Sequence, residues 1–236
     1  MKKYIGTKQV SATPAWRIGG EVFPKDGEVP HVMNREDGYK VVYDDGYESW
    51  SPKDVFEKAY KIAETPVDRM QIEAEEVNGR YVKLAAFIDS GKMDEVVNDM
   101  YNKCLLEMQC CTMFDYIRLL DTRIQRMQGS DGAKVRKMNF GMAIMALKAG
   151  YSIRRSGWNG KGLMVFKQVP AHIESDIIPK MQSLPQSAKD LILKGKGFID
   201  YTSQCLIYNE NTGRADSWVP SISDVFAEDW EIVMEK

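Results

Sequence analysis

The pattern of apolar and polar positions divides the chain into three parts, and residues 1–64 form the first. Lys40–Tyr43 and Tyr47–Trp50 flank an Asp-Asp-Gly turn, which predicts a β-hairpin because Asp-Gly supplies the positive φ angles of a tight turn. One or two further strands are expected within residues 4–23, and the Pro-, Gly- and acid-rich residues 24–38 predict a loop.

A helix is expected to follow this hairpin. Ser51 is predicted as its N-cap and Pro52 as its first helical residue, with the helix reaching about Ala63. The segment is therefore predicted to be a small α+β module. Its Trp16, Tyr39, Tyr43 and Trp50 could line a site, but we expect them to form the core.

Residues 65–129 carry helical periodicity instead. Two heptad seams occur: Met70, Ala74, Val77, Tyr81, Leu84 and Ile88, and then Leu106, Cys110, Met113, Ile117, Leu120, Ile124 and Met127. Gly91 separates them, which predicts a helical hairpin. Leu105, Met108 and Leu119 add a second apolar stripe, so the longer helix needs another neighbour. That neighbour is either a second copy of the chain, which we favour, or a flanking domain.

Gly129–Gly132 predicts a linker and a domain boundary near residue 131. Residues 133–236 then predict an α+β domain on an antiparallel sheet. Asn139 is predicted to cap a helix over Phe140–Leu147 that ends before Gly150. Strands are expected at 151–155, 163–169, 204–208, 214–218 and 230–234, with helical pieces at 173–194 and 223–227.

Composition and charge narrow the classes of protein. The 236 residues include 32 basic and 34 acidic side chains, so a duplex nucleic-acid binder, which usually carries basic excess, is not expected. No segment has the 18 or more apolar residues of a membrane span, and no apolar run follows the basic N-terminus as in a signal peptide.

Few residues are available for metal or nucleophilic chemistry. The two histidines, His31 and His172, make a metal site or a histidine triad improbable. The four cysteines form no C-x-x-C pair, and we expect buried free thiols at Cys104, Cys110, Cys111 and Cys205. No cofactor, metal or catalytic residue is predicted.

The turn Gly157–Gly162 is the first candidate binding element. Its three glycines allow close backbone approach and N–H groups that point at anionic oxygens, although the spacing is not that of a phosphate-binding P-loop. A plain hairpin turn with a packed Trp158 is the competing interpretation. Beside it, Arg154 and Arg155 are expected to point to opposite faces of a strand, so that one can reach a phosphate.

The second candidate cluster runs from Asp216 to Trp230. Trp218 could stack on a base, and Asp224 could accept hydrogen bonds from a ribose or an adenine amino group. The structural alternatives are Ser223 as a helix N-cap, Asp224 as a first-turn carboxylate and Trp230 in the core. Aromatic, arginine and small polar residues without a nucleophile–base pair favour binding over catalysis.

Several motifs occur in the order seen in the Thoeris anti-defence 2 family of phage proteins, which residues 138–235 resemble. They are Met138–Ala143, Arg155–Gly162, Trp218–Ser221, Ser223-Asp224 and Ala227–Trp230. Ile222 departs from the pattern, because the family often has a polar residue there.

The resemblance implies a sponge, which is not an enzyme. Such proteins are homotetramers that bind a cyclic ADP-ribose-type signal between protomers and do not cleave it. Some members are also described as holding CBASS cyclic oligonucleotides (di- or trinucleotides) at separate sites. The protein would then act in the cytoplasm of the infected bacterial host.

By motif, the resemblance assigns the ligand contacts. Phe140, Trp158 and Trp218 would be walls or stacking residues, Arg155 with Asn159 and Gly160 would meet the pyrophosphate, and Ser221 and Asp224 would meet ribose or base. The alternatives are a phage structural or protein-interaction module, an enzyme that degrades a cyclic nucleotide, and a protein that binds a TIR or effector protein directly.

Overall fold

The computed structural model describes residues 9–233. The parts of the predictions that fall on Met1–Lys8 and Met234–Lys236, including the end of the last strand, lie outside the described residues. The chain divides into two units, residues 1–75 and 76–236, and each is described by itself. This division falls inside a helix, and the predicted boundaries near residues 64 and 131 remain predictions.

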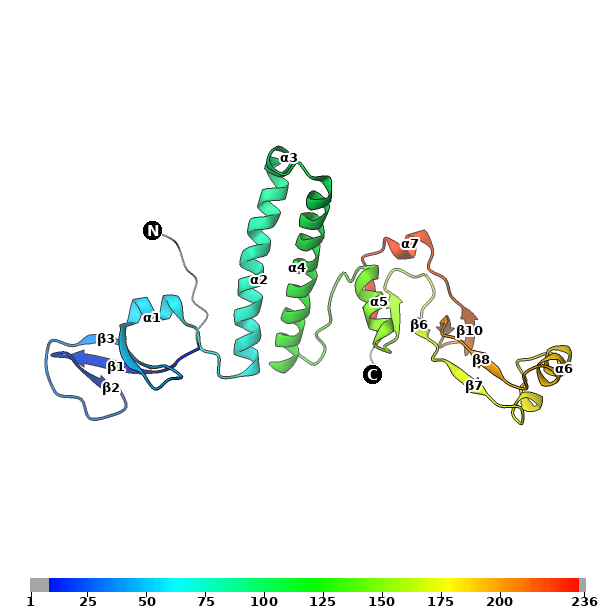
Figure 1. Cartoon of the computed structure of the whole chain (residues 1–236), viewed down its shortest axis with the longest axis horizontal. Coiled ribbons are helices and arrows are strands. Elements are labelled where there is room, and N and C mark those ends of the chain that lie inside the picture. Colours follow the sequence, from blue (N-terminus) through cyan, green and yellow to red (C-terminus); the bar gives the residue numbers. More distant parts are fainter. Residues whose placement is uncertain (1–8, 234–236) are drawn as a thin grey trace. The chain divides into compact units, whose positions relative to one another are not determined.

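The first unit contains a four-stranded antiparallel sheet in the order β2-β1-β3-β4 (Figure 1). Its strands are β1 (Ser11–Ile18), β2 (Glu21–Pro24), β3 (Glu36–Val42) and β4 (Glu48–Pro52). The hairpin over Lys40–Trp50 is confirmed, with Gly46 at φ 82° in its turn. The predicted loop is wrong at its end, because β3 already begins at Glu36.

Helix α1 (Lys53–Ala59) follows, but its predicted start is wrong. Ser51 and Pro52 belong to β4, and Pro52 takes the N-cap position without a side-chain cap. Pairing of Ser51 with Tyr39 in the sheet overrides its capping tendency. Phe56 of α1 stacks on Tyr39 at 4.3 Å between ring centroids and on Tyr60 at 4.8 Å, so these aromatic residues build core.

Three helices follow: α2 (Pro66–Asp89), α3 (Lys92–Val96) and α4 (Met100–Met127). The predicted hairpin is confirmed, with one additional short helix after Gly91. All residues of the first seam are buried or half-buried, and so are those of the second except Met127, which is 53% exposed. Within the second unit, Tyr81 of α2 contacts Phe114 of α4 at 5.6 Å between ring centroids.

The second apolar stripe of α4 is covered only in part. Leu119 packs against the core of the C-terminal domain, so a flanking domain is one neighbour of this stripe, and packing against a second copy stays a prediction. Leu105 and Met108 are 43% and 60% exposed, and Cys104 and Cys111 are exposed on the same helix. The prediction of buried thiols is therefore wrong for these two cysteines, because neither lies on the seam that faces α2.

The C-terminal domain holds a five-stranded antiparallel sheet in the order β10-β9-β6-β5-β11. The strands are β5 (Ile153–Arg155), β6 (Leu163–Lys167), β9 (Cys205–Asn209), β10 (Arg214–Ser217) and β11 (Trp230–Ile232). Helix α5 (Phe140–Lys148) packs on β5, β6 and β11. The Asn139 cap is confirmed: its side chain accepts from the Met142 N–H at 3.0 Å, and Gly150 follows with φ 90°.

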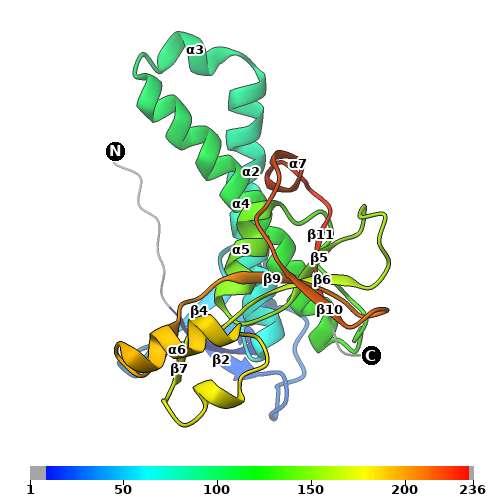
Figure 2. The same cartoon turned by 90° about the vertical axis from the view of Figure 1, so that its right-hand side faces the viewer.

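An arm leaves the sheet between β6 and β9 (Figures 1 and 2). It consists of β7 (Ala171–Ile173), the 3-10 turn Ile178–Lys180, α6 (Gln186–Lys194) and β8 (Ile199–Tyr201). The two helical pieces were expected, but the β7–β8 ribbon was not, because three-residue strands show no periodicity. The short α7 (Ile222–Val225) precedes β11. An α+β architecture, the predicted class, is thereby confirmed.

Gly38 of β3 provides a test of the packing in the first unit. A Cβ there would lie 2.3 Å from the Ser51 carbonyl oxygen and 2.8 Å from the Trp50 ring. Because backbone cannot yield as a flexible side chain can, we expect Gly38→Ala to cost about 1–3 kcal/mol. Gly27→Ala is the matched control, since its nearest neighbour would be the Pro24 oxygen at an ordinary 3.6 Å. Urea unfolding of both variants measures the difference, and equal midpoints would contradict this packing.

Candidate functional site

The fully buried Trp230 is the centre of the candidate site. Its ring contacts the three aromatic residues predicted as ligand walls, at centroid distances of 5.6 Å to Phe140, 5.5 Å to Trp158 and 6.1 Å to Trp218. These three are only half-buried, and they come from α5, from the turn after β5 and from the residue after β10. The structure therefore brings the predicted walls together around one core indole.

Asp224 is the buried acid of this region, with 7% of its surface exposed. Ser221 and Asp224 form a capping box at the start of α7: the Asp224 N–H donates to Ser221 Oγ, and the Ser221 N–H donates to Asp224 Oδ2. The N-cap is Ser221 and not Ser223. The structural alternative for Asp224, a carboxylate in the first turn of a helix, is thus confirmed, and this carboxylate also accepts hydrogen bonds from other residues.

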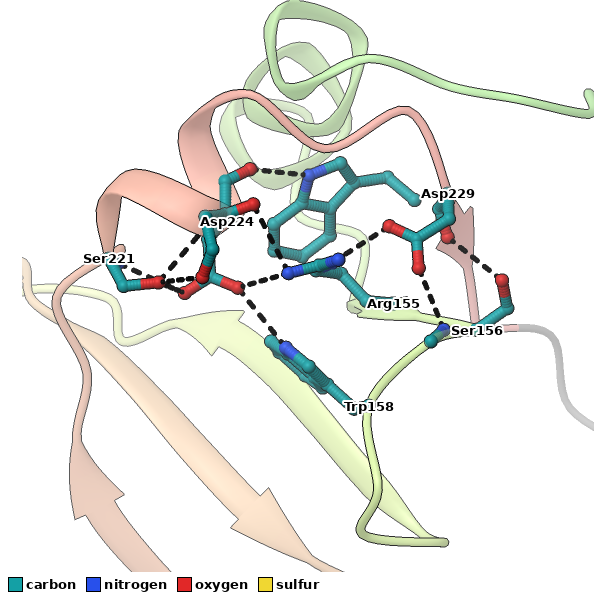
Figure 3. A network of polar contacts seen from close by, with 9 residues as sticks. Arg155, Ser156, Trp158, Ser221, Asp224 and Asp229 are labelled. Carbon is teal, nitrogen blue, oxygen red and sulfur yellow. Dashed lines mark hydrogen bonds and ion pairs between the residues drawn. The ribbon is translucent and has the colours of Figure 1, made fainter.

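Arg155 is the cation that compensates this acid (Figure 3). Its Nη1 donates to Asp224 Oδ1 at 3.0 Å, and its Nε donates to Asp229 Oδ1 at 2.7 Å. Trp158 Nε1 also donates to Asp224 Oδ1, at 3.2 Å, and Trp230 Nε1 donates to the Asp224 carbonyl at 3.0 Å. One arginine thereby joins β5, α7 and the start of β11.

Arg154 lies on the other face of β5, as the strand pattern predicts. It pairs with Glu231, its neighbour across the β5–β11 ladder, at 3.2 Å. Its side chain is 41% exposed, whereas that of Arg155 is 18% exposed. The two adjacent arginines therefore have different roles, and only Arg155 faces the aromatic cluster.

The glycine turn binds an anion that belongs to the chain itself. The Gly157 N–H donates to Asp229 Oδ2 at 2.7 Å, and a Cβ at Gly157 would lie 2.5 Å from that oxygen. Gly160 has a packing role, since its Cβ would meet Leu163 at 2.6 Å. Asn159 and Gly160 are exposed. Asp229 lies in the candidate cluster Asp216–Trp230, but no signal in the sequence indicates that it pairs with Arg155.

The electrostatics favour charged carboxylates in this network. Burial by itself would raise the pKa of Asp224, but hydrogen bonds from Ser221, Arg155 and Trp158 outweigh it, and the pKa lies below its ordinary value. Burial would likewise raise the pKa of Asp229, but the hydrogen bonds from Arg155 and from the Gly157 N–H outweigh it, and the pKa is lowered. The two acids in turn raise the pKa of Arg155, Asp229 more than Asp224. The cluster is an ionic frame in which two charged carboxylates share one arginine, so it keeps one net negative charge.

An exposed apolar patch lies beside this frame and was not predicted as a site. It consists of Val219, Ile222 and Phe226, which are 81%, 77% and 81% exposed. Ile222 is the first residue of α7 and follows the N-cap Ser221. Phe226, four residues later, is at the C-terminal end of the helix. The available signal was Ile222, which departs from the family pattern, followed by Phe226 directly before the Ala227–Trp230 motif.

Within residues 9–233 no group of three or more His, Cys, Asp or Glu side chains is placed to hold a metal ion. None of the helices in the same range is long and apolar enough to span a membrane.

Comparison with known proteins identifies the family. Residues 138–233 match the model of the Thoeris anti-defense 2-like domain, and residues 64–126 match the model of a family described as Sequestin. The chain is 34% identical over 102 residues to Thoeris anti-defense 2 of Bacillus phage SP01, an alignment that covers 41% of this chain and 96% of that protein. The chain therefore belongs to the Thoeris anti-defense 2 family, and this kinship supports a phage anti-defence role.

Arg155 and Arg154 form a matched pair for testing the ionic frame. Arg155→Gln removes the cation that Asp224 and Asp229 share, so we expect a loss of about 2–4 kcal/mol at neutral pH, against less than about 1 kcal/mol for Arg154→Gln. Because the folded-state pKa values of Asp224 and Asp229 are lowered, their stabilisation is complete above the ordinary pKa near 4 and is lost as the pH falls through the folded-state values. Urea unfolding at pH 7 and in acid should show the gap between the variants and its narrowing; equal losses at pH 7 would contradict the frame.

Proposed function

We propose that the protein is an anti-defence sponge that binds and sequesters a cyclic ADP-ribose-type signal without cleaving it, in the cytoplasm of the infected bacterium. The observation that carries the proposal is the group of half-buried aromatic rings held around Trp230 by the Arg155 frame, in a chain of the Thoeris anti-defense 2 family. A sponge works by stoichiometric binding, so it needs a preorganised pocket and no reacting group.

The geometry divides the predicted ligand residues into two sets. In the proposal, Phe140, Trp158 and Trp218 offer aromatic faces, and the exposed Asn159 and Gly160 offer backbone groups to the pyrophosphate. The second set comprises Arg155, Ser221 and Asp224. Both Asp224 oxygens already accept hydrogen bonds within the chain, so this set acts by holding Trp158 and the glycine turn in place. Arg155 meets the signal only at its remaining 18% exposed surface.

A second protomer would complete this pocket. The Val219, Ile222 and Phe226 patch lies beside the frame, and large exposed apolar residues gathered in one place are typical of protein interfaces. Contact through this patch would enclose a ligand between chains and couple signal binding to assembly. We therefore propose a homo-oligomer, a tetramer by family resemblance.

The helical hairpin would add a second contact to such an assembly. Tyr101, Leu105 and Met108 are 71%, 43% and 60% exposed, and they repeat at the spacing of one helix face on α4. Pairing of this face with its copy would bury the part of the second stripe that the C-terminal domain leaves uncovered.

The same exposed patches support an alternative function, a phage protein-interaction module without a small ligand. In this alternative Arg155 has a structural role only, as its two carboxylate partners suggest, and the patch around Phe226 binds a protein. The alternative predicts no heat of binding with any cyclic nucleotide and a partner that co-purifies from infected cells.

Calorimetric titration separates these functions. We expect the full chain to bind glycocyclic ADP-ribose tightly, and Trp218→Ala to weaken binding roughly five- to a hundredfold, because stacking on a base contributes about 1–3 kcal/mol. Tyr151→Ala is the matched control, since Tyr151 is an exposed aromatic residue of the same domain outside the predicted site. A parallel titration with a cyclic trinucleotide tests for CBASS signals at a separate site.

Recovery of the ligand distinguishes a sponge from a degrading enzyme. Heat denaturation of the complex should return the signal unchanged, as judged by chromatography. Absence of binding to both cyclic nucleotides, or the same affinity in Trp218→Ala and wild type, would favour the interaction module.

Assembly can be tested with one variant in each patch. Phe226→Ser and Met108→Glu should each lower the mass found by light scattering, because each places a polar group in a contact between copies. Neither side chain is buried in the single chain, so the melting temperature of the separated protomer should change little. A wild-type chain that is monomeric at high concentration, or variants that keep the wild-type mass, would exclude these contacts.

A further inference from the structure

We propose a second binding site, distinct from the aromatic one, for a small solute that carries two or more phosphate groups. It is a cavity of about 380 Å³ between α4, residues 132–137 and the start of β11. This volume is at the small end of the range typical of small-molecule sites. Ser156 and Glu228 are part of its wall, and its cationic members are Lys134, Arg136 and Lys137.

The charges of this wall are unbalanced toward the cations. Among residues 9–233, no ion pair or hydrogen bond engages the side chain of Lys134, Arg136 or Lys137. The acids nearby are different: Asp229 is held by Arg155 and the Gly157 N–H, and Glu231 is paired with Arg154. Three unpaired cations outnumber Glu228 and the one negative charge that Arg155 leaves on its two acids, so the cavity attracts an anion.

The cationic segment is also held in a fixed shape. Arg126 donates to the Ala133 carbonyl at 3.0 Å, and Arg118 of the same helix donates to the Arg136 carbonyl. The backbone N–H of Trp230 donates to the Met138 carbonyl at 3.1 Å. These bonds join the segment to α4 and to β11, so little conformational entropy is lost when a ligand binds there.

Lys137 lies in the left-handed region with φ 54°, as no other non-glycine residue does among the described ones. Such a conformation costs of order 1 kcal/mol, and it persists where surrounding structure imposes it. Residues in strained backbone are concentrated at binding sites, which is consistent with a segment shaped for a ligand.

The chemistry of the wall identifies phosphate as the ligand group. The guanidinium of Arg136 matches phosphate with a planar fork of donors, and the two ammonium groups act as adjustable point charges. Trp230 lines the cavity but is fully buried, so no aromatic face is offered to a base. A compact polyphosphate-bearing solute therefore fits better than a stacked nucleobase, and a cavity of this size excludes a nucleic-acid duplex.

The cationic segment of this site lies outside both matched family ranges, although part of the remaining wall lies inside them. Residues 127–137 lie between the ranges 64–126 and 138–233 that the two models match. The cations are thus a property of the junction in this chain, and the proposal does not depend on the sponge function.

Titration of the full chain with inorganic pyrophosphate, at an ionic strength held constant with chloride, tests the site. We expect saturable binding of one pyrophosphate per chain, and weakening by roughly tenfold or more when Arg136→Gln and Lys137→Gln are combined, because hydrogen bonds to charged groups are lost. Lys196→Gln, an exposed lysine on the arm, is the control and should bind as wild type does. Trp218→Ala should also leave pyrophosphate binding unchanged, which separates this site from the aromatic one.

The proposal would be overturned by no saturable binding or by the same affinity in the double variant. Equal heats with sulfate at the same ionic strength would also overturn it, because they would indicate charge screening only. Displacement of pyrophosphate by a short single-stranded oligonucleotide at lower concentration would also overturn it, in favour of a nucleic-acid surface. If the double variant unfolds at a lower temperature, Lys134→Gln alone tests the same prediction with a smaller expected loss of affinity. The Lys134 residue is exposed, and its side chain forms no ion pair or hydrogen bond within residues 9–233.

Discussion

The C-terminal domain depends on the compensation of charge in a place that water barely reaches. Arg155 and Asp224 are both largely buried, and either one alone would carry a desolvation cost of several kcal/mol. Their pairing, together with Asp229, makes that burial tolerable and has a geometric consequence. Because the partners lie 69 and 74 residues from Arg155, satisfying one arginine fixes β5, α7 and the entry to β11 against each other.

The aromatic residues take their positions from this frame. Trp158 is oriented by its N–H bond to Asp224, and Trp230 is oriented by its N–H bond to the Asp224 carbonyl. The charged groups of the frame thus pair with one another, and the surface around them offers mostly aromatic ring faces and exposed backbone to a ligand. A ligand at such a surface would gain from stacking and from enclosure more than from ion pairing, which is why the exposed Val219, Ile222 and Phe226 matter for the proposed binding between protomers.

Local signals in the sequence predicted the local structure well. The Asn139 cap, the Asp-Asp-Gly hairpin, the two heptad seams and the opposite faces of Arg154 and Arg155 all follow from interactions within a few residues or one period. Ser51 shows where this fails, because its pairing with Tyr39 in the sheet outweighs its tendency to cap a helix. Free cysteines are usually buried, yet Cys104 and Cys111 are exposed, because burial depends on which face of the helix packs against another element. The partners of Arg155 could not be predicted, since a contact across 70 residues leaves no trace in one sequence.

Side chains of α4 fix the glycine-rich junction between the helical hairpin and the C-terminal domain. By composition Gly129–Gly132 is a flexible linker, but Arg118 and Arg126 donate to carbonyls just after it, and Asn139 Nδ2 donates to Asp115 Oδ2 at 2.7 Å. Leu119 adds an apolar contact to the domain core. Helix α4 is therefore a structural part of the domain that carries the aromatic site. The helix with the exposed Tyr101, Leu105 and Met108 is thus bonded to the segment that lines the cationic cavity. The residue after that segment, Met138, is bonded to Trp230 at the base of the aromatic cluster.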